Sequence, residues 1–442
     1  MTSDLKMNLE ALTLVVAAGK IRDGALSPVD YIQALFARVD AIEPRVQAWT
    51  TIDREAVLAE ARQMELEARR KQFRGPLHGV PVGVKDIFYT KNLRTTMGTT
   101  AFADFVPTYD ASVVKKLKNA GALIMGKCVT TVLVFLDPGP TRNPWNTEHT
   151  PGGSSSGSAA AVGARMCPVS IGSQTVGSVG RPGAYNGVVS IMPTQSRVNM
   201  AGAFPLAWSL DHVGIFSRSV ADIDVMLECL SETPMPSHPR RIDNHKIRVG
   251  IVKDFFLDKA DTETRGKIDE LSGKLANSGF QVASVSLPAI FDLHPAILRT
   301  LVRSEAASTH EQLLRAKSNA YGPKLRDLVQ LGELIDASTY LRARRIRRHY
   351  QRDMVRLFEH FDVLVTPGAP GPAPAGTATG DPVMQAPWTL ADFPTMTLPL
   401  ALATNGLPLG VQLTSAPLHE GLLLEVAKGI EEVIGFTAKP NL

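Results

Sequence analysis

From Gly79 onward, the sequence alternates short apolar runs, bounded by glycine or proline, with stretches of helical character. The helical stretches include residues 111–119 and 262–278. Buried strands that alternate with helices are typical of an α/β sheet. We therefore expect an α/β fold. The apolar runs are GVPVGVKDIF (79–88), GALIMGK (121–127), IRVGIV (247–252), QVASVSL (281–287) and DVLVTP (362–367).

The first 72 residues have a different texture and are expected to be helical. The segment SPVD (27–30) is a strong helix start, since it places a hydroxyl cap before a proline and an acidic residue in the first turn. A charged amphipathic stretch follows at 53–71, and residues 295–358 are also expected to be largely helical. At roughly 150 residues per domain, a chain of 442 residues forms two or three domains or one large α/β domain.

The composition is that of an ordinary globular chain, with 44% hydrophobic and 20% charged residues. A formal net charge of +4 is too small a bias to indicate nucleic acid or a membrane surface. Cys128, Cys167 and Cys229 lack CxxC spacing, and the ten histidines show no HExxH pattern, so neither a disulfide framework nor a metal site is expected. With no export signal and no apolar run of about 18 residues, the sequence predicts a soluble cytoplasmic protein.

Two segments suggest other functions. GALIMGKC (121–128) nearly matches the phosphate-loop pattern, but it ends in a cysteine instead of a hydroxyl residue, and Leu-Ile-Met between its glycines favours a strand. An arginine cluster lies in the helical stretch 340–361, without the interleaved aromatic residues of single-strand binders. We therefore expect a solvated helix face or structural ion pairs there instead of an RNA site. The cluster comprises Arg342, Arg344, Arg345, Arg347 and Arg348.

Two glycine-rich segments, PGGSSSGS (151–158) and GSQTVGS (172–178), place hydroxyl side chains in tight turns. Backbone N–H groups can converge in such turns, as a serine hydrolase requires: it needs a nucleophilic hydroxyl, a proton acceptor and donors aimed at the developing oxyanion. No GxSxG motif is present, and no histidine is placed as an obvious partner. The candidate base is Lys85, which emerges from an apolar run, because partial desolvation would lower its pKa and leave it neutral.

The stretches PGGSSSGSAAAVGA (151–164) and GSQTVGSVGRPGAYNGVVSIMPT (172–194) resemble the signature of the amidase signature family, and GVPVGVKD (79–86) resembles its lysine motif. The spacings also agree, with 69 residues from Lys85 to Ser154 and 24 from Ser154 to Ser178. The resemblance extends to NPWNTEHTPGG (143–153), PLAWSLDHVGIFSRSVAD (205–222), VLVTPGAPGPAP (363–374) and GLPLGVQL (406–413).

This resemblance covers nearly the whole chain, and residues 234–350 are the least similar. It implies one amidase signature domain, residues 1–442, with a mixed central β-sheet sandwiched between helices. The implied parts are N-terminal helices (1–72), a signature core with the catalytic residues (73–233), a variable α/β and helical segment on the substrate side (234–350) and a return to the core (351–442).

In this family, a Ser–cis-Ser–Lys triad carries out catalysis. The resemblance implies that Ser178 is the nucleophile, that Ser154 is the bridging serine after a cis Gly153–Ser154 bond, and that Lys85 is the base. It implies supporting hydroxyls from Ser155 and Thr175, and no metal or cofactor. One oxyanion-hole donor typically contributes about 3 kcal/mol in the transition state. The implied oxyanion hole consists of the backbone N–H groups of Thr175, Val176, Gly177 and Ser178.

Five positions near the nucleophile bear on the substrate. Gln174 stands where many members have Asp, as in the malonamidase-like branch. Arg181 matches an arginine that binds a substrate carboxylate in such enzymes; its alternative role is to bond loop carbonyls. Val176 replaces a frequent glycine and would be strained at a positive φ. Gly180 and Gly183 replace larger residues, which predicts a more open pocket with Arg181 and Gly180 as substrate-binding residues.

The sequence thus predicts a serine amidohydrolase that cleaves the C–N bond of a small or aryl amide, or of a carbamate such as a urethane, through an acyl-enzyme. The expected partner is a small-molecule substrate, without nucleic acid or membrane; homodimers are frequent in the family. Two alternatives remain open. One is the amidase (glutaminase) subunit of an aminoacyl-tRNA amidotransferase, which needs partner chains. The other is a non-catalytic binding protein, which the intact Lys85, Ser154 and Ser178 argue against.

Overall fold

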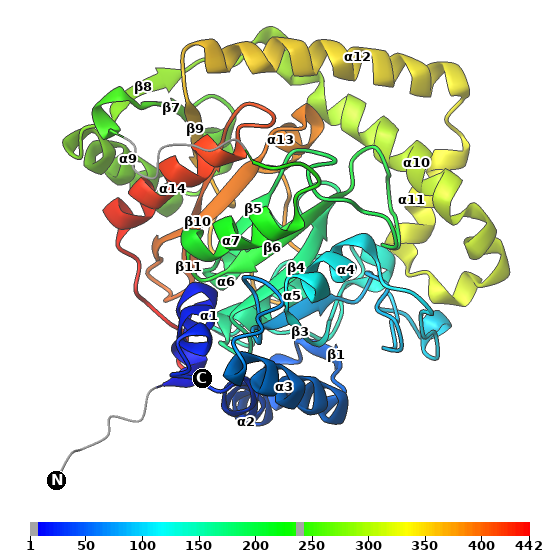
Figure 1. Cartoon of the computed structure of the whole chain (residues 1–442). Coiled ribbons are helices and arrows are strands. Elements are labelled where there is room, and N and C mark those ends of the chain that lie inside the picture. The colour runs from blue at the N-terminus through cyan, green and yellow to red at the C-terminus, as the bar shows by residue number, and fades with distance from the viewer. Residues whose placement is uncertain (1–7, 236–242) are drawn as a thin grey trace.

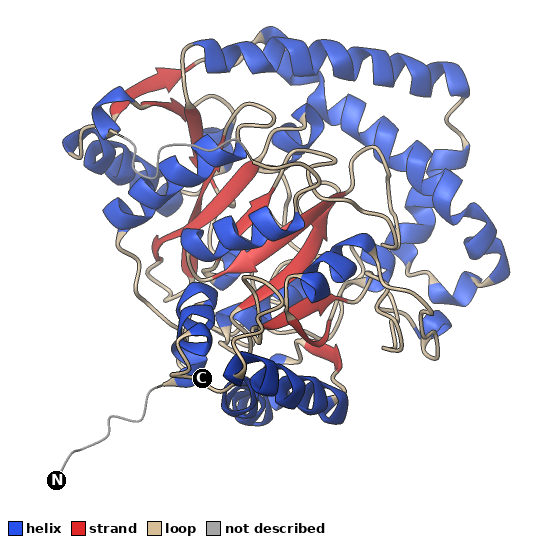
Figure 2. Ribbon diagram, in the orientation of Figure 1, coloured by secondary structure: helices blue, strands red, loops and turns tan. Residues whose placement is uncertain are grey.

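One mixed sheet of eleven strands forms the centre of the computed structural model, which describes residues 8–235 and 243–442 (Figures 1 and 2). The strands are β1 (Trp49–Thr51), β2 (Pro81–Lys85), β3 (Leu123–Cys128), β4 (Val169–Gln174), β5 (Val189–Met192), β6 (His212–Ser217), β7 (Arg248–Val252), β8 (Gln281–Val285), β9 (Val363–Pro367), β10 (Thr395–Leu402) and β11 (Pro408–Thr414). Their spatial order is β1-β3-β2-β4-β6-β5-β10-β11-β9-β7-β8.

The sheet contains both parallel and antiparallel pairs of neighbouring strands. Strand β2 is parallel to β3 and β4, and β7 is parallel to β8 and β9. The other neighbours, including the β10–β11 pair, are antiparallel. The predicted α/β fold with a mixed central sheet is therefore confirmed. Strands β7 and β8 come from the segment 234–350 and extend the same sheet.

Helices flank the sheet, with α7 and α14 in front of it in Figure 1. Helix α5 packs against β2, β3 and β4, and α6 packs against β5, β10 and β11. The helices are α1 (Leu14–Arg22), α2 (Pro28–Val46), α3 (Arg54–Arg69), α4 (Ser112–Asn119), α5 (Ser156–Gly163), α6 (Gly180–Asn186), α7 (Val220–Leu230), α8 (Phe256–Lys259), α9 (Thr262–Asn277), α10 (His294–Ala316), α11 (Pro323–Glu333), α12 (Ala337–Val355), α13 (Ala386–Ala391) and α14 (Glu420–Ile434).

The N-terminal segment is mostly helical, as expected, although residues 1–7 lie outside the described part of the chain. The Ser27 hydroxyl caps α2 by accepting from the N–H groups of Val29 and Asp30. The expectation of helices alone is incomplete, because Trp49–Thr51 forms the edge strand β1 beside β3. Three residues are too few to show the period-two alternation that identifies a strand.

The segment 121–128 forms a strand and no phosphate loop. Lys127 is fully buried in β3, and its amine donates hydrogen bonds of 3.2 Å to the hydroxyl of Thr90 and 3.1 Å to that of Thr95. These contacts hold the lysine inside the protein, where a phosphate does not reach it.

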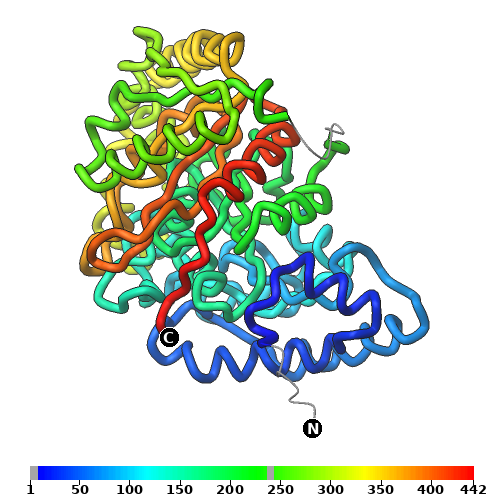
Figure 3. The backbone as a smooth tube through the Cα atoms, turned by 90° about the vertical axis from the view of Figure 1, so that its left-hand side faces the viewer, coloured from blue at the N-terminus to red at the C-terminus, as the bar shows by residue number. Residues whose placement is uncertain are grey.

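The C-terminal end of the described chain lies against the N-terminal helical segment (Figure 3). Arg38 of α2 donates a hydrogen bond of 3.2 Å to the backbone carbonyl oxygen of Leu442. Within residues 8–235 and 243–442, none of the helices combines the length and the apolar character needed to cross a bilayer.

Candidate active site

Lys85, the last residue of β2, is fully buried beneath the serine-rich loops. Its Nζ atom lies 2.8 Å from the hydroxyl oxygen of Ser154 and 2.8 Å from that of Ser173. Burial lowers the pKa of Lys85 well below its ordinary value, and the carboxyl of Asp211 opposes this shift. The lysine therefore loses its proton more readily than an ordinary lysine, as a general base requires.

Ser154 lies in the loop that precedes α5, and the Gly153–Ser154 peptide bond is cis. The neighbouring Ser155 binds the backbone of Ser173 twice. Its hydroxyl donates to the Ser173 carbonyl oxygen at 3.1 Å and accepts from the Ser173 N–H at 3.2 Å. These bonds fix the end of β4 to the loop that carries Ser154.

Ser173 is a polar neighbour of the lysine that the sequence analysis missed. It is buried in β4, one residue before Gln174, and its side chain contacts Lys85 directly. The available signal was its place in the GSQTVGS segment, two residues before the predicted oxyanion loop.

Ser178 is partly exposed, and its side chain forms no hydrogen bond within the described residues. In the same part of the structure, the N–H groups of residues 175–178 have no backbone or side-chain acceptor. A free hydroxyl beside four free donors fits a nucleophile and an oxyanion site. Val176, whose N–H is one of these donors, is not among the residues with positive φ, so the strain considered for it is absent.

The loop 175–178 is held from both sides by side chains. The Thr175 hydroxyl donates a hydrogen bond of 2.6 Å to the buried carboxylate of Asp211, and the hydroxyl of Thr389 donates one of 2.9 Å to the carbonyl oxygen of Val176. The side-chain oxygen of Gln174 accepts from the N–H groups of Val179 (2.8 Å) and Gly180 (3.1 Å) at the start of α6. Gln174 therefore supports the backbone around the nucleophile.

Asp211 is a second residue that the sequence analysis did not single out, although it lies in the family-like segment 205–222. Its other carboxylate oxygen accepts from the N–H groups of Leu206 and Ala207 at 2.9 and 3.1 Å. Burial raises the pKa of Asp211 to about 6.

The side chain of Arg181 forms its hydrogen bonds with the protein backbone. Its guanidinium donates hydrogen bonds of 2.6 Å to the carbonyl oxygens of both Gly153 and Gly380, and the side chain is almost completely buried. These contacts match the alternative role of bonding loop carbonyls and give no support to Arg181 as a substrate-binding residue.

The prediction of a more open pocket at two glycines is wrong, because other side chains fill the space. A Cβ atom at Gly180 would lie 2.9 Å from the side chain of Gln385, and one at Gly183 would lie 2.3 Å from the hydroxyl of Ser190. Both glycines are buried in α6. Gly180 is therefore packed against Gln385, which gives no support to a substrate-binding role.

A cavity of about 410 Å³ lies beside the loop 175–178. Val176 and Pro382 line it, and a Cβ atom at Gly177 would come within 2.7 Å of Pro382. Most of the lining is apolar and includes Phe255, Leu298 and Val302. Three charged residues complete the wall: Arg299, Arg303 and Asp381.

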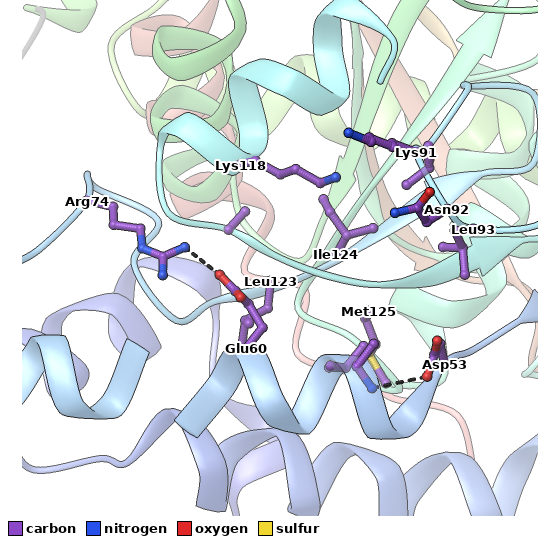
Figure 4. Close-up of a pocket in the computed structure, with 14 residues that line it drawn as sticks. Asp53, Glu60, Arg74, Lys91, Asn92, Leu93, Lys118, Leu123, Ile124 and Met125 are labelled. Carbon is purple, nitrogen blue, oxygen red and sulfur yellow. Dashed lines mark hydrogen bonds and ion pairs between the residues drawn. The ribbon is translucent and has the colours of Figure 1, made fainter. Parts of the chain in front are cut away.

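A second cavity, of about 390 Å³, lies between α3 and β3 (Figure 4). Two of its cations already have partners: Arg74 is paired with Glu60, and Lys118 is paired with Asp110. None of the predicted oxyanion-loop residues lines it, whereas Val176 of that loop lines the first cavity, so we assign the candidate active site to the first cavity.

The comparisons with known proteins agree with this chemistry. The model of the family described as Amidase matches residues 30–424. The chain belongs to the amidase family. As an amidase, it is an enzyme that acts on C–N bonds. A solved structure described as a crystal structure of an amidase is 31% identical, with a TM-score of 0.89, over 96% of this amidase and 100% of that chain.

Curated relatives of this amidase carry a more specific name. It is 33% identical to the A subunit of the glutamyl-tRNA(Gln) amidotransferase of Carboxydothermus hydrogenoformans, over 99% of this chain and 100% of that protein. The corresponding protein of Geobacter metallireducens, which bears the same name, is 31% identical, over 96% of this chain and 98% of that protein.

These relatives correct two expectations. The main functional prediction, a hydrolase of small or aryl amides or of carbamates, is wrong, because the relatives that match over nearly the whole chain are amidotransferase subunits. The expected partners, a small molecule without nucleic acid, are wrong for the same reason: the relatives belong to an enzyme named for a tRNA. The findings favour the alternative stated beside that prediction.

Proposed function

We propose that this amidase is the glutaminase subunit of an aminoacyl-tRNA amidotransferase. It would hydrolyse the side-chain amide of glutamine and supply ammonia to partner subunits that amidate an aminoacyl-tRNA. The observation that carries the proposal is the match, over at least 96% of this chain, to curated subunits of that enzyme. The length of the match supports a shared role for the whole chain.

In the proposed mechanism, neutral Lys85 accepts a proton from Ser178 through the hydroxyl of Ser154. The Ser178 oxygen attacks the amide carbon, and the N–H groups of residues 175–178 stabilise the oxyanion. The relay then returns the proton to the leaving nitrogen, which departs as ammonia. Water hydrolyses the acyl-enzyme and releases glutamate. The bond of 2.8 Å between Lys85 and Ser154 supports the first step.

The cavity beside Val176 suits a free amino acid. Glutamine carries an ammonium and a carboxylate on its α-carbon, and the wall contains both an acid, Asp381, and two cations, Arg299 and Arg303. Opposite charges of this kind orient a zwitterion. We propose that Asp381 pairs with the ammonium and that Arg299 or Arg303 pairs with the carboxylate.

Ammonia release from glutamine by the purified chain tests the proposal, with asparagine and an aryl amide as competing substrates. We expect glutamine to be preferred over the aryl amide by about tenfold or more, since a site that pairs both α-groups rejects an analogue without them. Trapping by mass spectrometry should find a glutamyl adduct on Ser178. A preference for the aryl amide, with glutamine untouched, would sink the proposal.

Two further expectations stay proposals. We propose that the chain is divided at residues 72, 233 and 350, and that the variable segment 234–350 lies on the side where the substrate binds. Strands β7 and β8 and helix α10 belong to that segment. We also propose a cytoplasmic location, because aminoacyl-tRNA is used in that compartment.

A further inference from the structure

Helix α12 concentrates positive charge that the proposed mechanism does not use. It contains six arginines and one acidic residue, Asp353, although the whole chain has a formal net charge of only +4. One face of the helix is buried and is formed by Ala343, Arg347, Tyr350 and Met354. The opposite face is exposed at the outer edge of the molecule, as Figures 1 and 3 show.

Three arginines on the exposed side form what we call the arginine face: Arg342, Arg345 and Arg348. They are spaced three residues apart, so they follow one another along the helix surface. Within the described residues, none of the three has an ion pair or a side-chain hydrogen bond. The expected structural ion pairs therefore do not account for them.

The other arginines of the helix have partners. Arg344 donates to the hydroxyl of Tyr340, and Arg352 pairs with Asp353. Arg347 is buried and donates to the carbonyl oxygens of Ser209 (2.8 Å) and Leu390 (3.0 Å). The arginines of α12 thus form two sets. One set bonds to the protein, and the other faces solvent without a counter-charge in the described structure.

We infer that the arginine face binds the phosphate backbone of an RNA, which under the proposed function is the tRNA of the amidated substrate. Guanidinium groups bind phosphate oxygens through paired N–H donors. Three adjacent, unpaired cations repel one another, and a polyanion relieves this repulsion while it releases its own counterions. A protein partner would require an apolar centre, and this face offers only Leu341, which is 64% exposed.

The buried side of α12 connects the arginine face to the active site. Arg347 is bonded to Ser209 and to Leu390. Leu390 follows Thr389, whose hydroxyl binds the carbonyl oxygen of Val176 in the oxyanion loop. Each link is a hydrogen bond between packed segments or the peptide bond between Thr389 and Leu390, so an RNA on the arginine face would lie at a fixed distance from the amidase site.

Binding of tRNA(Gln) to the full chain, measured over a series of salt concentrations, tests the inference. The variant R342E/R345E/R348E should bind at least about tenfold more weakly. In a plot of the logarithm of the binding constant against the logarithm of the salt concentration, its slope should be less steep by about 2 to 3, since three phosphate contacts are lost. The variant R342K/R345K/R348K keeps the charge and should keep most of the slope.

The matched control is R62E/R70E/K71E, which makes the same charge change at exposed residues on and beside α3, at the opposite end of the molecule (Figure 1). Equal loss in the control and in the α12 variant would overturn the inference, and so would a wild-type chain that does not bind tRNA. Glutamine hydrolysis by wild type without RNA is measured separately. If that activity is absent while the α12 effect is present, only the proposed function fails.

Discussion

The amine of Lys85 lies 2.8 Å from the hydroxyl of Ser173, a contact outside the proposed triad. Ser173 is itself tied to Ser155 through its backbone. The lysine is therefore held between two serine hydroxyls from different strands and loops, and only one of them lies on the proposed proton path. Ser173 is a positioning residue in this arrangement.

Replacement of Ser173 by alanine should lower kcat for glutamine by about three- to tenfold, the effect of one hydrogen bond of 0.5–1.5 kcal/mol. It should also move the acid limb of the pH profile to lower pH, because a less polar pocket lowers the pKa of Lys85 further. The control is Ser156→Ala; within the described residues, the Ser156 hydroxyl donates one hydrogen bond, of 3.4 Å, to the carbonyl oxygen of Val129. An unchanged pH profile would contradict a positioning role.

Ser178→Ala should remove glutamine hydrolysis by about a thousandfold or more, because the nucleophile is lost. The free energy of unfolding should stay within about 0.5 kcal/mol of wild type, since the hydroxyl has no partner in the described structure. Ammonia release and urea unfolding measure the two quantities. Lys85→Ala combined with Ser178→Ala should be no slower than either single variant; additive losses would argue against a shared relay.

The pH dependence follows from the buried lysine. Because burial lowers the pKa of Lys85 in the folded state, kcat/KM should rise with pH as this residue loses its proton and then stay level. In the unfolded chain Lys85 regains its ordinary pKa of 10.5, so its contribution to the free energy of unfolding should increase with pH up to that value. Activity that falls as the pH rises through the range in which the amine loses its proton would rule out a neutral lysine base.

Arg181→Met should destabilise the protein by about 2–4 kcal/mol, because two buried carbonyl oxygens lose their donor. Arg181→Lys should recover only part of this, since a single ammonium does not reproduce the fork that reaches Gly153 and Gly380. Urea unfolding measures the change. A raised KM for glutamine at unchanged stability would instead identify Arg181 as a substrate-carboxylate clamp.

Asp381→Asn should raise the KM for glutamine by about tenfold, the loss of one exposed charge-assisted contact. The KM for a neutral amide without an α-ammonium should not change. Asp258→Asn, at another exposed acid, provides the matched control. Equal effects on both substrates would remove Asp381 from glutamine recognition.

Much of the fold could be predicted from local patterns. The strands β2, β3, β7 and β9 coincide with apolar runs, and the cap at Ser27 is where the sequence places it. What could not be predicted depends on contacts between distant segments. Asp211, just before β6, reaches Thr175, just after β4, and nothing in either segment alone indicates that contact. The expectation of an open pocket at the glycines of α6 is wrong because the side chains of Gln385 and Ser190 occupy the space beside them.

The position of β10 and β11 in the sheet determines when the sheet can close during synthesis of the chain. These two strands are the last in the sequence, yet they lie between β5 and β9 and join β7, β8 and β9 to the rest. Until residues 395–414 leave the ribosome, the earlier strands can form only two separate partial sheets with open edges. Exposed edges of this kind promote aggregation. The nascent chain therefore depends on residues 395–414 to close the sheet, and a chain truncated before residue 395 would be left with two unfinished partial sheets.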